Sequence, residues 1–149
     1  MHGGAAIVGV PVALACVLGG CSTGAPTDSH VSTAVLTHFR GVPRGVEVPQ
    51  QAAAAKSPKP FAAWAAPGRV YVITWSSSSC PDIPAFVIPL RHDYVEIKTV
   101  AHDFHPGDNG CSADLGPTTS VVALPNDIDE HHPVTIWIDG MATNLPARS

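Results

Sequence analysis

The stretch Val70-Tyr71-Val72-Ile73-Thr74-Trp75 carries apolar or β-branched side chains on both of its faces. Such side chains favour an extended strand, and a strand that is apolar on both faces belongs in the middle of a sheet with cover on each side. Four serines, Ser76 to Ser79, and then Cys80-Pro81 end the stretch. We therefore predict a central buried strand here and a β-rich fold around it.

Four further segments downstream show strand patterns. Residues 85–90 are apolar, although Pro89 cannot donate to a ladder and places that end at a sheet edge. Residues 94–100 alternate, with Val95 and Ile97 facing one way, and should pair with 85–90 as a hairpin. The last two segments are residues 118–124 and 134–138. Five strands within about 80 residues predict a mainly β fold, either a small antiparallel β-sandwich or a partly open barrel.

The first 20 residues have the character of a signal peptide. Gly3 to Gly20 carry no charge and contain two apolar runs, which Gly9 and Pro11 interrupt. A stable transmembrane helix needs roughly 20 consecutive apolar residues, and this interrupted segment does not supply them. We therefore expect residues 1–20 to be a signal peptide that is removed.

Leu18-Gly19-Gly20-Cys21 closes this segment with a branched apolar residue, two small residues and a cysteine. These four residues resemble the lipobox of bacterial lipoproteins. The resemblance implies cleavage before Cys21, attachment of diacylglycerol to its thiol, and acylation of the new amine by a chain such as palmitate. Two or more acyl chains hold a protein on a membrane where one does not. The expected location is the extracytoplasmic face of the cell membrane; the alternative is ordinary secretion after cleavage at Gly19-Gly20.

The cysteine count agrees with this division of the chain. The four cysteines are Cys16, Cys21, Cys80 and Cys111. The first leaves with the leader and the second would carry lipid, so one pair remains. In an oxidising compartment that pair predicts a Cys80–Cys111 disulfide, which closes a loop of about thirty residues and stabilises the fold by roughly 3 to 4 kcal/mol. The sequence has no C-x-x-C motif for redox chemistry, and the remaining pair, Cys80 and Cys111, does not have zinc-finger spacing.

Two motifs around these cysteines carry a second resemblance. Trp75 to Pro81 has the sequence W-S-S-S-S-C-P, and Cys111 to Pro125 has the sequence C-S-A-D-L-G-P-T-T-S-V-V-A-L-P. They resemble paired motifs in small, uncharacterised exported proteins of high-GC Gram-positive bacteria, over roughly Gly68 to Ile138. The resemblance implies a domain with bridged cysteines and brings no activity with it.

Composition divides the chain into five parts. They are a signal peptide at 1–20, a lipidated cysteine and flexible tether at 21–33, a Pro- and Ala-rich arm at 34–67, the β-domain at 68–140 and a loose C-terminal tail at 141–149. Where tether and arm meet, the spacing of Val31, Val35 and Phe39 favours one or two helical turns. Phe61 and Trp64 of the arm are expected to dock on the domain, because a pure linker rarely contains Trp.

Two loops contain side chains of the kinds that bind metals. In the first loop, the imidazoles of His102 and His105 beside Asp108 suit zinc or copper. In the second, His131 and His132 follow an acidic run that begins at Asp127. If both loops lie at one end of the sandwich, they would form a mixed histidine and carboxylate site. We favour solvated polar loops instead, because the spacing matches neither H-E-x-x-H nor an EF-hand calcium loop.

No motif of a known catalytic class is present in the sequence. The chain lacks a G-x-S-x-G elbow, an S-x-x-K motif and a phosphate-binding glycine loop. Its eight Lys and Arg are scattered and its net charge is −4, which excludes a basic patch for nucleic acid. Ser76 to Ser79 are then expected to form a polar turn, and Asp114 to cap another. Four aromatic residues either line a ligand groove or belong to the core: Phe61, Trp64, Trp75 and Trp137.

These observations favour a non-enzymatic binding or interaction module that is held near the membrane, with no cofactor and with an envelope protein or polymer as its partner. The alternative is a metal-binding lipoprotein that uses zinc or copper at the two histidine loops.

Overall fold

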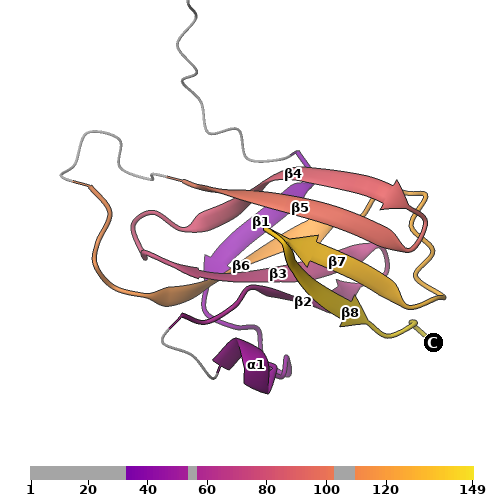
Figure 1. Ribbon diagram of the computed structural model, residues 1–149, viewed down its shortest axis with the longest axis horizontal. Coiled ribbons are helices and arrows are strands. Elements are labelled where there is room, and N and C mark those ends of the chain that lie inside the picture. Colours follow the sequence, from indigo (N-terminus) through magenta and orange to yellow (C-terminus); the bar gives the residue numbers. More distant parts are fainter. Residues whose placement is uncertain (1–32, 54–56, 103–109) are drawn as a thin grey trace, which may run out of the picture.

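The computed structural model describes residues 33–53, 57–102 and 110–149, which form two four-stranded β-sheets (Figure 1). The first sheet has the order β1 (Val35–Arg40), β6 (Gly116–Ala123), β3 (Arg69–Ser76) and β2 (Phe61–Ala66). The second has the order β4 (Asp82–Arg91), β5 (Tyr94–Ala101), β7 (Val134–Ile138) and β8 (Met141–Leu145). A short helix, α1 (Gln50–Ala53), lies below the first sheet in this view.

The stretch that starts at Val70 forms most of β3, which lies between β6 and β2 as a central strand. Val70 and Val72 are fully buried in the cluster between the two sheets. On the opposite face of β3, Ile73 packs in a second cluster with Phe61 and Ala52. Both faces of the strand are therefore covered, as its sequence predicted.

The main core lies between the two sheets and draws side chains from both. Alternation along each strand places apolar residues inward, so that every second residue of β7 is fully buried. The buried residues of this core are Ala62, Val70, Val72, Val122 and Leu124 from the first sheet and the end of β6, and Val95, Ile97, Val134, Ile136, Ile138 and Leu145 from the second. The mainly β prediction is confirmed, and the strands form two separate sheets, not one closed barrel.

The predicted hairpin is present, because β4 and β5 pair antiparallel around the turn at His92-Asp93. Pro89 lies near the end of β4, an edge strand, as expected. Two features differ from the prediction. The described residues form eight strands, not five, and β5 pairs with β7 in parallel, so the fold is not purely antiparallel.

The segment expected to be a Pro- and Ala-rich arm is part of the fold. Val35–Arg40, where helical spacing predicted a turn or two of helix, is strand β1, and Phe61–Ala66 is strand β2. Between them, Val42, Val46 and Ala52 cover the outer face of β3. Phe61 and Trp64 dock on the domain as expected, but the segment that carries them does so as strands of the first sheet and not as a separate arm. The helix prediction for this segment was wrong because β1 is an edge strand whose residues are mostly exposed on both faces. Its sequence therefore lacks the alternation of apolar and polar residues that marks a half-buried strand.

The C-terminal residues are also ordered within a sheet, so the prediction of a loose tail is wrong for Met141–Leu145. This segment is strand β8, which pairs antiparallel with β7, and Leu145 is buried in the main core. Asp139 and Gly140 connect β7 and β8 with φ angles of 48° and 85°. A two-residue turn with positive φ at both positions matches the twist of a hairpin.

Candidate functional site

His102 lies at the opposite end of the second sheet from His131 and His132. His102 follows the end of β5, whereas His131 and His132 precede β7. Because β5 and β7 run parallel with Tyr94 opposite Thr135, the eight steps along the strand from Tyr94 to His102 separate His102 from His131 and His132 by on the order of 25 Å. A single ion with ligand bonds near 2 Å cannot bind His102 together with His131 or His132. His105 and Asp108 lie outside the described residues.

Among the described residues, no group of three His, Cys, Asp or Glu side chains is arranged to hold a metal ion. The Asp129 carboxylate instead accepts hydrogen bonds from the amide of His131 at 3.0 Å and from Nδ1 of His132 at 2.7 Å. These bonds lower the pKa of Asp129, the His131 amide contributing most. These contacts hold the turn before β7, and they engage the Asp129 carboxylate with the neighbouring histidines.

The rest of the acidic loop holds neighbouring segments in place. Oε2 of Glu130 accepts the amide hydrogen of Gly68, at 2.8 Å, in the turn between β2 and β3. The backbone oxygen of Glu130 accepts the amide hydrogen of Arg148, also at 2.8 Å. The Arg148 guanidinium in turn lies 5.6 Å from the ring centroid of Trp64. This loop therefore joins the first sheet to the C-terminal segment.

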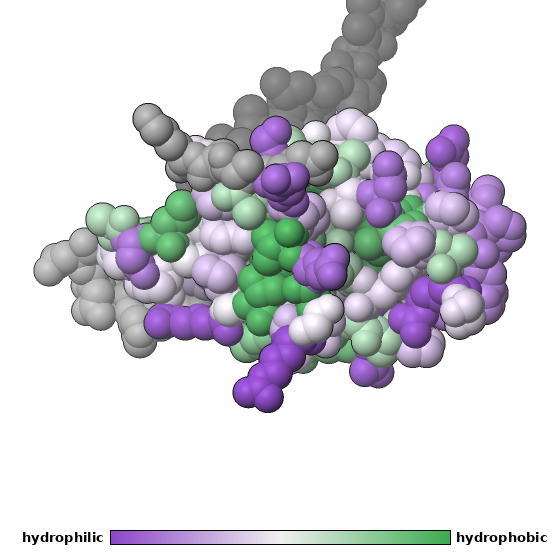
Figure 2. Space-filling model, turned by 90° about the horizontal axis from the view of Figure 1, so that it is seen from below, coloured by the Kyte–Doolittle hydropathy of each residue, from purple (hydrophilic) through white to green (hydrophobic). Residues whose placement is uncertain are grey.

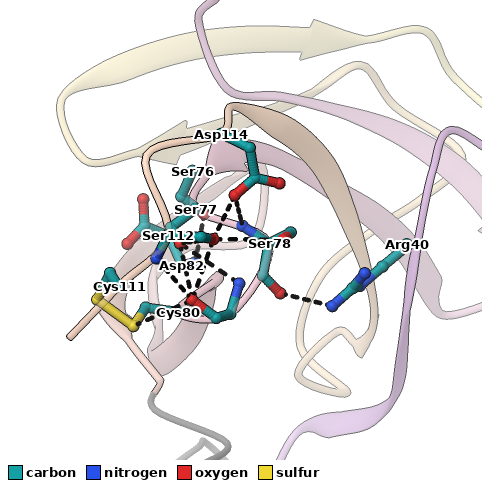
Figure 3. Close-up of a disulfide and its surroundings, with 10 residues drawn as sticks. Arg40, Ser76, Ser77, Ser78, Cys80, Asp82, Cys111, Ser112 and Asp114 are labelled. Carbon is teal, nitrogen blue, oxygen red and sulfur yellow. Dashed lines mark hydrogen bonds between the residues drawn. A yellow bond between two sulfur atoms is a disulfide. The ribbon is translucent and has the colours of Figure 1, made fainter. Parts of the chain in front are cut away.

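The predicted disulfide is present, with the Cα atoms of Cys80 and Cys111 5.4 Å apart (Figure 3). Beside it, the serine turn and Ser112 form a cluster of hydroxyls. The Ser112 hydroxyl lies 2.8 Å from that of Ser77 and accepts a hydrogen bond from Ser79 at 3.1 Å. The Ser112 amide donates to Oγ of Ser79 at 2.8 Å. Four serines and one disulfide thus fasten the segment before β6 to the segment before β4.

Asp114 connects the same two segments. Its Oδ1 accepts hydrogen bonds from the Ser112 hydroxyl and, at 3.3 Å, from the Ser78 amide. These bonds, with that from Ser112 the largest contributor, lower the pKa of Asp114 to about 2. Because their bonds join the segment before β6 to the segment before β4, the hydroxyl cluster and Asp114 act as a clamp between these segments, and Asp114 does more than cap a turn.

The described residues form a groove of about 410 Å³ between the segment around α1 and strand β8. One wall comes from the segment around α1 and the start of β2, and the other from β8. The lining residues are Pro49, Ala52, Lys59, Pro60 and Phe61 on the first wall, and Met141, Ala142, Thr143 and Asn144 on the second. Figure 2 views the molecule from the α1 side and shows hydrophobic residues gathered near the centre of this face, with hydrophilic residues around them.

The edges of the two sheets meet at this groove. The Ala62 amide on β2 donates to Oγ1 of Thr143 on β8 at 3.3 Å, and Nε1 of Trp64 donates to the backbone oxygen of Pro146 at 2.7 Å. Phe61 is nearly fully buried beneath the groove, where its ring lies 5.7 Å from that of Trp75. The groove wall is therefore backed by packed aromatic rings.

The chemistry of the groove suits binding. Lys59 is the only ionisable residue among the described residues that line it, and Asn144 offers a side-chain amide. The remaining lining is apolar except for Thr143, whose hydroxyl bonds to β2. Small-molecule and peptide sites have volumes of roughly 300 to 1,000 Å³ and combine an apolar lining with a few polar groups.

Sequence reasoning missed this groove because its two walls belong to the segments predicted as an arm and a loose tail. Phe61, which was expected either in a groove or in the core, belongs to both. Strand β8 could have been predicted from Asp139-Gly140, because an Asp-Gly pair that follows an alternating strand favours a hairpin turn and hence a second strand after it. Cys21 lies outside the described residues.

Comparisons with known proteins do not place the chain in a family. No family model matches it, and neither a curated protein nor a solved structure is similar to it. Within the described ranges, no helix has the length and apolar character needed to cross a membrane.

Proposed function

We propose that the chain is a lipid-anchored extracytoplasmic protein whose β-domain binds a ligand in the groove between α1 and β8, without enzymatic activity. The anchor would be Cys21, on the resemblance of Leu18-Gly19-Gly20-Cys21 to a lipobox. The disulfide between Cys80 and Cys111 supports an exported location, because such bonds persist in oxidising compartments and are rare in the cytosol.

The groove is the observation that carries the binding role. Its exposed lining combines apolar and polar surface in similar measure, which favours a ligand with both kinds of group, and Lys59 favours one that presents an anionic or hydrogen-bond-accepting group. A segment of an envelope protein or a substituted envelope polymer has this chemistry. Among the described lining residues, no nucleophile is paired with an acid or a base, so the groove supplies contacts and not catalytic groups.

Labelling in living cells tests the anchor. The chain should incorporate a fatty-acid label and fractionate with membranes, and Cys21→Ala should abolish both. A Cys21→Ala chain that still carries label and remains in the membrane fraction would contradict the anchor.

Site-specific photo-cross-linking tests the groove. A benzophenone side chain at the exposed Ala142, in the lining, should give a discrete adduct in intact cells. The same group at the exposed Asp127, in the loop before β7, is the matched control and should give none. Equal adducts at both positions, or none at either, would contradict a ligand-binding groove.

A further inference from the structure

Strand β4 exposes an unusual set of large apolar side chains. Phe86 is 59% exposed, Ile88 is 40% exposed and Leu90 is 53% exposed, although all three lie within one strand. Phe86 and Ile88 are two residues apart and share the outer face of the second sheet, opposite Lys98 and Glu96 of β5. A concentration of exposed apolar residues on a small domain marks a contact surface.

This surface lies on the opposite side of the molecule from the groove. The β2 and β8 edges meet at the groove, so β1 and β4 are the two edges at the far side. In Figure 1, β4 and the start of β1 both lie in the upper part of the molecule, whereas α1 lies at the bottom. Val35 of β1 and Val87 of β4 both pack against the core between the two sheets. Leu36 of β1, at 49% exposed, adds to this edge.

The β4 edge is poorly suited to accept another strand. Pro84 and Pro89 lack the amide hydrogen that a ladder needs. The pairing of β4 with β5 also shifts register at two places, between Pro84 and Phe86 and between Pro89 and Arg91. Prolines and bulges are the features that keep edge strands from pairing with other chains. An occupant of this surface must therefore contact the side chains and not the backbone.

The charges beside β4 are neutralised within the molecule. Nε of Arg91 lies 3.2 Å from Oδ1 of Asp93, and Nζ of Lys98 lies 2.8 Å from Oε1 of Glu96. The chain as a whole has a net charge of −4. The surface consequently offers apolar contact with no net charge to attract an anionic partner.

We propose that the β4 edge rests on the phospholipid surface, with Phe86, Ile88 and Leu90 at the boundary between headgroups and acyl chains. This inference rests on the proposed function, in which Cys21 is lipidated. Cys21 precedes Thr33, the first described residue, by 12 positions. Even a fully extended chain of 12 residues spans at most about 40 Å, so lipid on Cys21 would hold the start of β1 within that distance of the bilayer. The anchor thus keeps this edge at high local concentration near the bilayer, and the groove faces away from it.

Paramagnetic relaxation in nanodiscs tests the orientation. The complete chain, matured and acylated in a bacterial host, is placed in phosphatidylcholine nanodiscs that contain a lipid with a nitroxide headgroup. We expect selective loss of the amide signals of Val87 and Ile88, whereas those of Ala142 and Asn144 on β8 persist. The double substitution Phe86→Ser and Ile88→Ser should abolish that selectivity. Leu115→Ser, at a residue that is 56% exposed outside β4, should preserve it.

The outcomes separate this inference from the function on which it rests. Acylated protein whose β4 and β8 signals weaken equally would overturn the lipid contact and leave the anchor standing. A mass spectrum that shows no acyl chain on Cys21 would overturn both. A dimer in sedimentation that dissociates in the Phe86→Ser and Ile88→Ser variant would show that a second copy occupies the surface, and would also overturn the lipid contact.

Discussion

The Ala62 amide on β2 donates a hydrogen bond to Oγ1 of Thr143 on β8, across 3.3 Å. The two strands belong to different sheets, so this bond joins the sheet edges that the backbone ladders leave separate. Thr143 also lines the groove. One hydroxyl therefore connects the stability of the β2 and β8 edges to the shape of the proposed binding site.

Thr143→Val should lower the free energy of unfolding by about 1 to 3 kcal/mol, because it keeps the shape of the side chain but leaves the Ala62 amide without its acceptor. Urea unfolding measures the change. Thr143→Ser retains the hydroxyl and is the matched control, which should lose clearly less. Equal losses in the two variants would show that the methyl group, not the hydrogen bond, holds the edges together.

Ile73→Ala should destabilise the domain by about 2 to 5 kcal/mol, because it opens a cavity between β3 and the cover that Phe61 and Ala52 provide. Ile88→Ala removes the same atoms from an exposed position on β4 and should change stability by less than about 0.5 kcal/mol. Urea unfolding of both variants makes the comparison. A small effect of Ile73→Ala would mean that residues 41–53 do not seal the outer face of β3.

Replacing both Cys80 and Cys111 by Ala should lower the free energy of unfolding by about 3 to 4 kcal/mol, as expected for a bond that closes a loop of about thirty residues. The separation of the two cysteines is 31 positions. Treating the native protein with a reductant should give a similar loss, and the double variant should not respond to reductant. A native protein whose midpoint in urea is insensitive to reductant would contradict this account.

The sequence predicted the centre of the fold better than its margins. Buried strands with apolar residues on one or both faces, such as β3 and β7, have patterns that burial itself produces. The strands that were missed carry weaker patterns: β1 is mostly exposed, and β2 is rich in Ala. The place of β1 depends on pairing with β6, which is distant in sequence, and local patterns do not encode such pairing. In contrast, β2 forms a hairpin with β3 across the two-residue turn at Pro67-Gly68, and its Ala-rich sequence has too weak a strand pattern to show this.

The candidate sites were predictable to different degrees. Cys80 and Cys111 could be paired because cysteine count and compartment leave few alternatives. The separation of His102 from His132 depends on the parallel pairing of β5 and β7, which no local signal shows. The groove depends on the meeting of β2 and β8, where the hydrogen-bonded residues Ala62 and Thr143 are 81 positions apart. A site formed by two sheet edges becomes visible only once the order of strands in both sheets is known.

Asp114→Asn should lower thermal stability at neutral pH and have little effect in strong acid. The pKa of Asp114 is lowered from 3.8 to about 2 by the Ser112 and Ser78 bonds. A lowered pKa adds stability that is complete above the unfolded value, near pH 4, and is lost as the pH falls through about 2. Melting temperatures from pH 2 to pH 7 should therefore converge for native and variant protein at the acid end. Asp127→Asn, in an exposed loop, is the control, and a constant difference for Asp114→Asn across the range would contradict a charge-dependent clamp.

Lys59→Ala should reduce the yield of the Ala142 adduct in cells without changing the melting temperature, because Lys59 is exposed and its ammonium is the only charge among the described lining residues. Lys59→Arg keeps the charge and should retain most of the adduct, whereas Lys59→Glu should remove more of it than Lys59→Ala does. Lys98→Ala is the control. It deletes a cation on β5 that pairs with Glu96 of the same strand and does not line the groove, so it should leave the adduct unchanged. An adduct that persists in Lys59→Glu would mean that the ligand is held by the apolar lining alone, and the requirement for an anionic group would then be wrong.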